Sequence, residues 1–332
     1  MRYILCIWCC FFSTVVLSQS SKINGVSFVA SGQAVDADQV AKLKNINTNY
    51  AAVMPFGFIR NPAHPVLYFN TDRQWFGERV DGVSQYIDAL HAQEIEVMLK
   101  PQIWISKGVF TGKLRMETDA DWELLELHYT EFITTFAHVA TEKNVAVFCI
   151  GTELEAFVKA RPQFWFRLIK KVRDIYKGKI TYAANWDEYT STPFWSVLDY
   201  IGVDAYFPLS DAKHPDVEEL QAGWSSWKIA LETISKKANT PILFTEFGYR
   251  SMNYTAKKPW LVDRHQDGVN LAAQATALQV QLETFWCEDW FAGGFVWKWF
   301  LEHQRAGGKN DNRFTPQNKP AEQVLKRWYT NF

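Results

Sequence analysis

Two glutamates in this sequence directly follow apolar runs of the kind that form buried strands. Glu246 lies in PILFTEFGYR (241–250), and Glu153 lies in AVFCIGTELE (146–155). A buried carboxylate without a partner costs several kcal/mol, so each needs either a structural partner or a chemical use. Two facing carboxylates supply the general acid and the nucleophile or base of glycoside hydrolysis. Glu155 is a rival to Glu153, because alternation along a strand places both on the same side.

Polar and aromatic side chains also end the other apolar runs. Besides the two glutamates they are Lys100, Gln102, Trp104, Thr152, Asn185, Trp186, Asp187, Asp204, Tyr206, Thr245, Trp297, Lys298 and Trp299. After residue 19 the sequence has no Cys-x-x-Cys or His-x-x-x-His spacing, so neither a metal nor a cofactor is expected. Aromatic residues make up 16% of the chain, with 15 tryptophans, which suits a cleft that stacks on the apolar faces of sugar rings. Trp260, in a long loop, is a candidate outer platform.

Eight apolar runs must position these residues, and they alternate with amphipathic segments. This pattern predicts a single-domain α/β fold, a parallel (β/α)8 TIM barrel, whose catalytic residues lie at the carboxyl ends of the strands. An open doubly wound sheet is the alternative, but the first run is not followed by its Gly-x-Gly-x-x-Gly loop. The expected strands span 23–30, 50–59, 96–105, 145–153, 179–186, 200–207, 241–249 and 292–300.

Helix signals lie between these runs. Asp36 is a candidate N-cap, and Pro320 suits the first turn of a terminal helix. The fifth connection, 187–199, looks short and irregular. Three long stretches without periodicity follow strands and are expected to form loops over the site: 106–120, 251–269 and 301–319. The expected helices span 36–47, 82–93, 121–143, 161–176, 217–238, 270–286 and 320–332.

The 332 residues are 48% apolar and 21% charged, a composition typical of a globular protein. The net charge is −1 and the sequence has no basic stripe, which gives no support to nucleic-acid binding. Residues 1–19 resemble a signal peptide, followed by a catalytic domain over 20–332, with a retained anchor or lipidation as alternatives. The protein is therefore expected to be secreted, periplasmic or on the cell surface. Whether Cys149 and Cys287 pair is left open, and no obligate protein partner is inferred.

The two glutamate motifs, 93 residues apart (246 − 153), resemble the acid/base and nucleophile motifs of retaining TIM-barrel glycosidases. From about Ile23 to Trp328 the chain is similar to glycoside hydrolase family 113, a family of β-1,4-mannanases. The segments that carry this resemblance, besides CIGTELE and FTEFGYR, are LKPQIW, GVDAYFP, GFVWKWF and TPQNKPAEQVLKRW.

The resemblance implies that Glu153 is the acid/base and Glu246 the nucleophile, with Tyr206 donating a hydrogen bond to Glu246. It also implies a sugar-binding role for the other strand-end residues. Trp297 or Trp299 would form the floor of the central subsite, and Lys100 and Trp104 would line the non-reducing side. Thr152 stands where the wider clan has an asparagine that holds the sugar 2-hydroxyl, a contact that Asn185 would replace. Trp186 and Asp204 complete the expected substrate-binding set.

The sequence thus predicts a retaining hydrolase of β-1,4-mannan or its oligosaccharides. Retention requires the two carboxyl groups to lie ~5–5.5 Å apart, against ~6.5–9.5 Å for inversion. Within the class, a β-glucan-specific enzyme and an exo-acting β-mannosidase are alternatives. Outside it, a non-catalytic carbohydrate-binding barrel is the alternative.

Overall fold

Eight parallel strands close into a barrel in the computed structural model, which describes residues 22–261 and 268–332. The predicted signal peptide lies outside the described residues. The predicted TIM barrel is confirmed. In the order in which they pair around the barrel, the strands are β1 (Ile23–Phe28), β11 (Phe291–Trp299), β10 (Ile242–Phe247), β9 (Ile201–Ala205), β8 (Lys179–Asn185), β7 (Val147–Thr152), β5 (Glu96–Leu99) and β2 (Tyr50–Val53).

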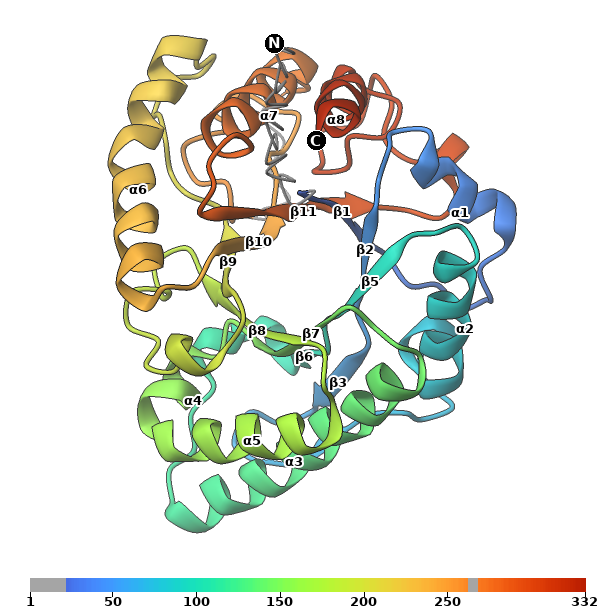
Figure 1. The fold of residues 1–332 in the computed structure, drawn as a ribbon, viewed down its shortest axis with the longest axis vertical. Coiled ribbons are helices and arrows are strands. Elements are labelled where there is room, and N and C mark those ends of the chain that lie inside the picture. The colour runs from blue at the N-terminus through green and yellow to red at the C-terminus, as the bar shows by residue number, and fades with distance from the viewer. Residues whose placement is uncertain (1–21, 262–267) are drawn as a thin grey trace, which may run out of the picture.

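Helices surround this barrel on the outside (Figure 1). The predicted caps are present: Asp36 accepts from the backbone of Gln39 at the start of the first helix, and Pro320 begins the last. The helices are α1 (Ala37–Lys44), α2 (Val80–His91), α3 (Asp119–Glu142), α4 (Glu155–Ala160), α5 (Pro162–Ile175), α6 (Val217–Ala238), α7 (Leu271–Phe285) and α8 (Pro320–Asn331). As expected, the fifth connection has only a short 3-10 turn, Trp195–Val197.

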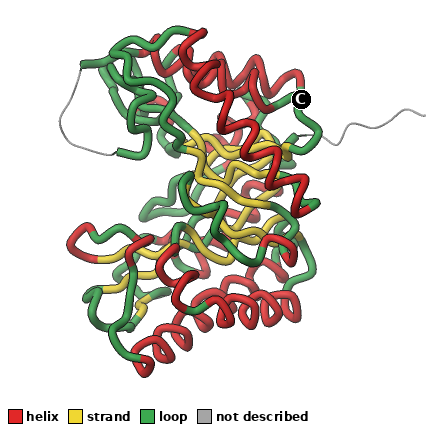
Figure 2. Tube along the Cα trace, turned by 90° about the vertical axis from the view of Figure 1, so that its left-hand side faces the viewer, coloured by secondary structure: helices red, strands yellow, loops and turns green. Residues whose placement is uncertain are grey.

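Two of the predicted strands are each broken into two. After β2 the chain forms β3 (Phe56–Ile59), and after β5 it forms β6 (Gln102–Ile105); with β4 (Leu67–Tyr68) these build a separate three-stranded sheet. The breaks fall at Pro55 and Pro101, which lack the N–H that a strand donates to its neighbour. In Figure 2 the short strands lie outside the barrel, at the lower left.

The core has two layers. Most buried side chains pack between the barrel and the helices, whereas a smaller cluster fills the barrel interior. In the interior Phe295 packs against the backbone of Gly25, where a Cβ atom would lie 2.4 Å from its ring. Cys149 belongs to this interior cluster and Cys287 is exposed, and both are free thiols, so the possible disulfide is not formed.

Candidate active site

The end of β10 presents Glu246 to the carboxyl end of the barrel. The pairing of β10 with β9 shifts register between Phe244 and Glu246, and Glu246 lies opposite Asp204. Tyr206, just beyond β9, donates its hydroxyl proton to Glu246 Oε2 at 2.8 Å, the hydrogen bond that was expected. The Gln102 amide donates to Glu246 Oε1 at 3.2 Å. Both carboxylate oxygens are therefore held in place by donors.

Lys100 lies beneath this carboxylate. Its Nζ is 2.6 Å from Glu246 Oε1 and 3.0 Å from Asp204 Oδ1, and its side chain is 0% exposed. Asp204 also accepts from the hydroxyl of Thr245 at 2.8 Å. Lys100 and Asp204 had been expected to bind substrate. They are instead a buried pair that supports Glu246, because the barrel strands bury both side chains completely.

The charge states of Lys100 and Asp204 depend on their burial and on the charges of their neighbours. Burial acts to lower the pKa of Lys100, but the charges of Asp204 and Glu246 outweigh it and raise that pKa above its ordinary value. Burial, followed by the charge of Glu246, raises the pKa of Asp204 to about 7. Lys100 therefore remains a cation, and it stabilises the ionised form of Glu246 that a nucleophile needs.

Glu153 follows β7 in a left-handed conformation, with φ of 51°. Such a backbone is costly for a residue with a side chain and occurs preferentially at functional sites. Its N–H donates to the carbonyl of Ala183 in β8 at 2.8 Å, which fixes the turn. Burial, then the charges of Asp204 and Glu246, raises the pKa of Glu153 well above its ordinary value. The carboxyl is therefore held in the protonated form of a general acid.

A cleft of about 440 Å³ contains both glutamates. Trp186 and Trp260 stack in its wall with ring centroids 4.8 Å apart, and Phe314 packs edge-on against Tyr206. Trp260 was expected as an outer platform; Phe110 and Phe314 come from the predicted loops 106–120 and 301–319 but were not singled out. The lining residues are Phe110, Glu153, Asn185, Trp186, Asp187, Tyr206, Glu246, Trp260, Trp297 and Phe314.

The other expected binding residues lie elsewhere. Trp299 is fully buried, because its end of β11 turns it into the core, so Trp297 is the tryptophan of this strand that lines the cleft. Trp104 is exposed and lines a second cleft. Thr152 has a buried hydroxyl with no hydrogen-bond partner among the described residues. Glu155, the rival carboxylate, begins α4 and pairs with Lys159.

The site therefore brings two glutamates into one aromatic cleft, Glu246 held by a cation and two donors and Glu153 with a raised pKa. The family model of Glycoside Hydrolase Family 113 matches residues 30–319. The chain belongs to glycoside hydrolase family 113. It is therefore a glycoside hydrolase, as the resemblance of its sequence motifs had indicated.

Solved structures share the fold of this family member at low sequence identity. A β-mannanase of the same family from Alicyclobacillus acidocaldarius, in complex with ManMIm, is 24% identical, with a TM-score of 0.82 over 94% of this chain and 98% of that one. A β-1,4-mannanase complex of the family is 22% identical, with a TM-score of 0.81 over 94% and 100%. A β-glucuronidase from Faecalibacterium prausnitzii is 13% identical, with a TM-score of 0.62 over 94% and 49%. A search of curated proteins finds no match.

A buried carboxylate that sequence reasoning missed connects the ends of β7 and β8. Glu188 is 1% exposed, and it accepts from the hydroxyl of Tyr182 at 2.7 Å and from the N–H of Asn185 at 3.1 Å. Tyr182 in turn accepts from the N–H of Leu154, the residue after the acid/base candidate, at 2.7 Å. Burial raises the pKa of Glu188 to about 7. Glu188 lies in the irregular connection 187–199, where its position gave no pattern.

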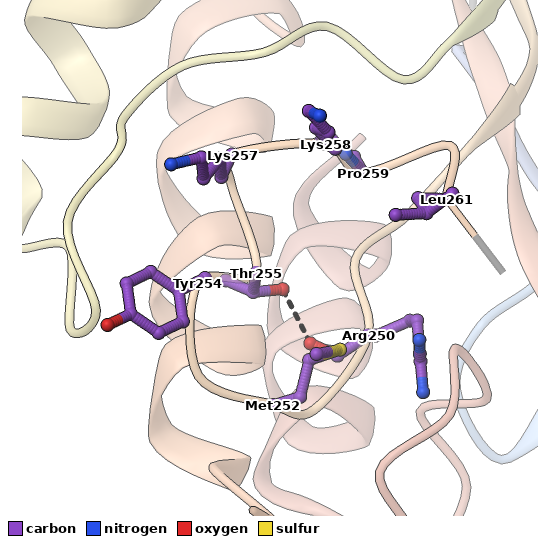
Figure 3. A pocket seen from close by; sticks show the side chains of 8 residues that line it. All are labelled: Arg250, Met252, Tyr254, Thr255, Lys257, Lys258, Pro259 and Leu261. Atoms are coloured by element: carbon purple, nitrogen blue, oxygen red, sulfur yellow. Dashed lines mark hydrogen bonds between the residues drawn. The ribbon is translucent and has the colours of Figure 1, made fainter. Parts of the chain in front are cut away.

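Another pocket, of about 340 Å³, lies in the segment after β10 (Figure 3). Here the hydroxyl of Thr255 donates to the carbonyl of Arg250, and the lining ends at Leu261, the last described residue before 268. Neither glutamate of the active site lines it. In the described ranges there is no cluster of three or more metal-binding His, Cys, Asp or Glu residues. Nor, over 22–261 and 268–332, does any helix have the length and apolarity to cross a membrane.

Proposed function

We propose that this hydrolase cleaves β-1,4-mannosidic bonds with retention of the anomeric configuration. In the first step Glu246 attacks the anomeric carbon and forms a glycosyl-enzyme ester, while Glu153 protonates the departing oxygen. In the second step Glu153, now a carboxylate, takes a proton from water as that water attacks the same carbon and releases Glu246. The observation that carries the proposal is that the two carboxyl groups have different surroundings. Donors and a cation contact Glu246, whereas the surroundings of Glu153 raise its pKa.

Glu246 is built to act as an anion, because a buried cation and two neutral donors contact its oxygens. Glu153 is built to hold a proton, because desolvation and the charges of Asp204 and Glu246 raise its pKa. A carboxylate contacted by a cation, beside a second carboxyl group that keeps its proton, is the usual arrangement of a nucleophile and an acid. This arrangement also disfavours the non-catalytic binding barrel, which has no need of a buried lysine beneath a carboxylate.

Mannan is the proposed substrate for a different reason. Two of the most similar solved structures are β-mannanases, and they cover nearly all of this chain and of their own. The aromatic walls of the cleft, with Trp186, Trp260 and Trp297, suit neutral pyranose rings. We therefore expect the protein to act on β-1,4-mannooligosaccharides.

The first experiment incubates the protein with β-1,4-mannooligosaccharides and follows the products, with the anomeric configuration recorded early by NMR. Internal fragments that appear first as the β-anomer are the expected result. Early α-anomer would overturn the retaining mechanism. Stepwise release of mannose would make the enzyme exo-acting, and cleavage of another β-glycan alone would overturn the mannan assignment.

The second experiment assigns the roles of the two glutamates. We expect Glu153→Gln to lower kcat/KM on mannooligosaccharides by roughly 10²–10⁴-fold, the usual contribution of a general acid, and to retain more activity on an aryl glycoside whose leaving group needs no proton. Glu246→Gln should reduce turnover of both substrates to near background, because no ester can form. Near-normal activity of either variant would remove that residue from the mechanism.

A further inference from the structure

A segment of the loop after β11 carries Phe314 into the active-site cleft without belonging to a helix or a strand. We call residues 311–314 the wall segment, because the last of them lines the cleft. The ring of Phe314 packs edge-on against Tyr206, with centroids 5.9 Å apart, and the hydroxyl of Tyr206 donates to Glu246. The position of the wall segment therefore affects how the nucleophile is held.

Every backbone carbonyl of the wall segment accepts a hydrogen bond from a side chain outside the segment. Two of the donors follow β10, one directly precedes α8 and one lies in α7. In the order of the carbonyls, the donors are Ser251 at 2.6 Å, Arg250 at 3.3 Å, Lys319 at 2.9 Å and Gln274 at 2.7 Å. A buried carbonyl without a partner costs free energy, so these side chains fix an irregular segment as paired strands fix one another in a sheet.

Lys319 holds the wall segment at two points. Besides the carbonyl of Arg313, its Nζ contacts Asp311 Oδ1 at 2.7 Å and the hydroxyl oxygen of Ser251 at 2.9 Å. The side chain of Lys319 is 0% exposed, and these three contacts use the three protons of its ammonium group. Lys319 therefore has no proton left for a ligand. What it does is join the first and third residues of the wall segment to the chain that follows β10.

Removing this ammonium group would release the wall segment. Asp311 would keep its charge without a cation, and the carbonyl of Arg313 would lose a charged donor. Water replaces both partners only when the segment moves outward, and Phe314 moves with it as the next residue along the chain. Tyr206 then loses an aromatic neighbour, and its hydroxyl is no longer kept on Glu246.

We propose that Lys319 is a positioning residue of this hydrolase, which acts through the wall segment to hold Phe314 against Tyr206 and the Tyr206 hydroxyl on Glu246. Lys319 does not line the cleft, so it acts only through these neighbours. The proposal rests on the proposed function, because it takes Glu246 as the nucleophile. It deepens that function, since it adds a residue of the last loop to those that prepare Glu246 for attack.

The test is a double-mutant cycle with Lys319→Met, Tyr206→Phe and the two substitutions combined. We measure kcat/KM on β-1,4-mannooligosaccharides at a temperature at which every variant is folded. Lys319→Met is expected to lower kcat/KM about tenfold, the effect of weakening one hydrogen bond to a charged group. In the Tyr206→Phe background the same substitution should have much less effect, because the hydrogen bond that it supports is already absent.

Lys22→Met is the matched control. Lys22 is also a buried lysine, and its Nζ donates to the carbonyls of Glu288 and Phe291, at the end of the barrel where the strands begin. Its substitution should lower the melting temperature and leave kcat/KM unchanged. If Lys319→Met does not fold, Asp311→Asn weakens the same contact and should show a smaller loss of kcat/KM with the same dependence on Tyr206.

Each outcome separates this proposal from the proposed function. If the wild type cleaves mannan and Lys319→Met keeps its kcat/KM, or loses as much in the Tyr206→Phe background, the proposal is overturned and the proposed function stands. If only another β-glycan is cleaved, the same cycle is measured with that substrate. If nothing is cleaved, crystal structures of the wild type and Lys319→Met decide. A Phe314 ring that has left Tyr206, with the hydrogen bond to Glu246 lost, supports the proposal, and unchanged positions overturn it.

Discussion

At the scale of single residues, Lys100 supports two carboxylates at once. Its Nζ contacts both Asp204 and Glu246 in a fully buried position. Removing the charge leaves two carboxylates facing each other without a cation, and breaking a buried pair in this way costs about 3–5 kcal/mol. One of the two carboxyl groups must then take up a proton.

Lys100→Met is therefore expected to raise the pKa of Asp204, which the charge of Lys100 lowers, as well as to destabilise the fold. Because the nucleophile loses the cation beside its oxygens, the acid limb of the kcat/KM–pH profile should move to higher pH. The control is Arg173→Met, which breaks the ion pair with Asp199 at the start of β8. It should lower the melting temperature without moving the acid limb, and an unshifted limb in Lys100→Met would argue against the role of the lysine.

Glu153 gives a prediction about stability as well as activity. Its pKa in the folded protein lies above the value of ~4.3 expected in the unfolded chain. Between these two values the folded state binds more protons than the unfolded state, so its contribution to stability is present below pH ~4.3 and is lost as pH rises through the folded pKa. Glu153→Gln removes this dependence.

We therefore expect Glu153→Gln to gain stability relative to the wild type as pH rises above ~4.3. The measurement is the free energy of unfolding of both proteins by denaturant titration across this range. A difference that does not change with pH would show that the surroundings do not hold the proton on Glu153.

At the scale of elements, the site depends on how the ends of β7 and β8 are joined. The hydrogen bonds of Glu188 and Tyr182 fix the backbone at Leu154, next to Glu153, and at Asn185, which lines the cleft. Tyr182→Phe leaves the buried N–H of Leu154 without its partner, which costs about 1–3 kcal/mol. Glu188→Gln replaces one of the two acceptor oxygens by an NH2 donor and removes a charge that raises the pKa of Glu153.

Glu188→Gln is accordingly expected to lower kcat and to move the alkaline limb of the activity profile to lower pH, because Glu153 then loses its proton more easily. The measurement is kcat/KM against pH for both variants. Tyr182→Phe keeps the charge of Glu188 and should reduce kcat with a smaller shift of this limb. If both variants and the wild type had the same kcat/KM–pH profile, the hydrogen bonds of Glu188 and Tyr182 would have only a structural role.

Most strands and helices could be predicted from the sequence. The eight apolar runs became eight barrel strands, because a strand with both faces covered must be apolar throughout. The separate sheet was not predicted, although Pro55 and Pro101 mark its origin. Within the runs 50–59 and 96–105, apolar character continued past each proline, and pattern alone did not reveal that the chain leaves the barrel there. The short helix α4 was missed because six residues give too little periodicity.

At the scale of the whole molecule, we propose that the chain is exported and that residues 1–19 are removed. Mass spectrometry of the protein secreted by its producing cells should then give a mature N-terminus near residue 20. A chain that begins at Ser20 should have the melting temperature of the exported form, because the described fold begins at Lys22, whose Nζ donates to the carbonyls of Glu288 and Phe291. A retained N-terminus would support the anchor instead.

Sequence alone determined the barrel and the family, and it selected Glu153 and Glu246 as the candidate catalytic pair. These follow from local signals: apolar strand runs, polar residues where they end, and motifs that are continuous in the chain. Only the tertiary structure decided that Lys100 and Asp204 lie beneath Glu246, that Trp299 faces the core while Trp297 faces the cleft, and that Glu188 braces two strand ends. These positions depend on the side of the strand to which each side chain points and on register shifts between paired strands. Both are fixed only when all eight strands pack together.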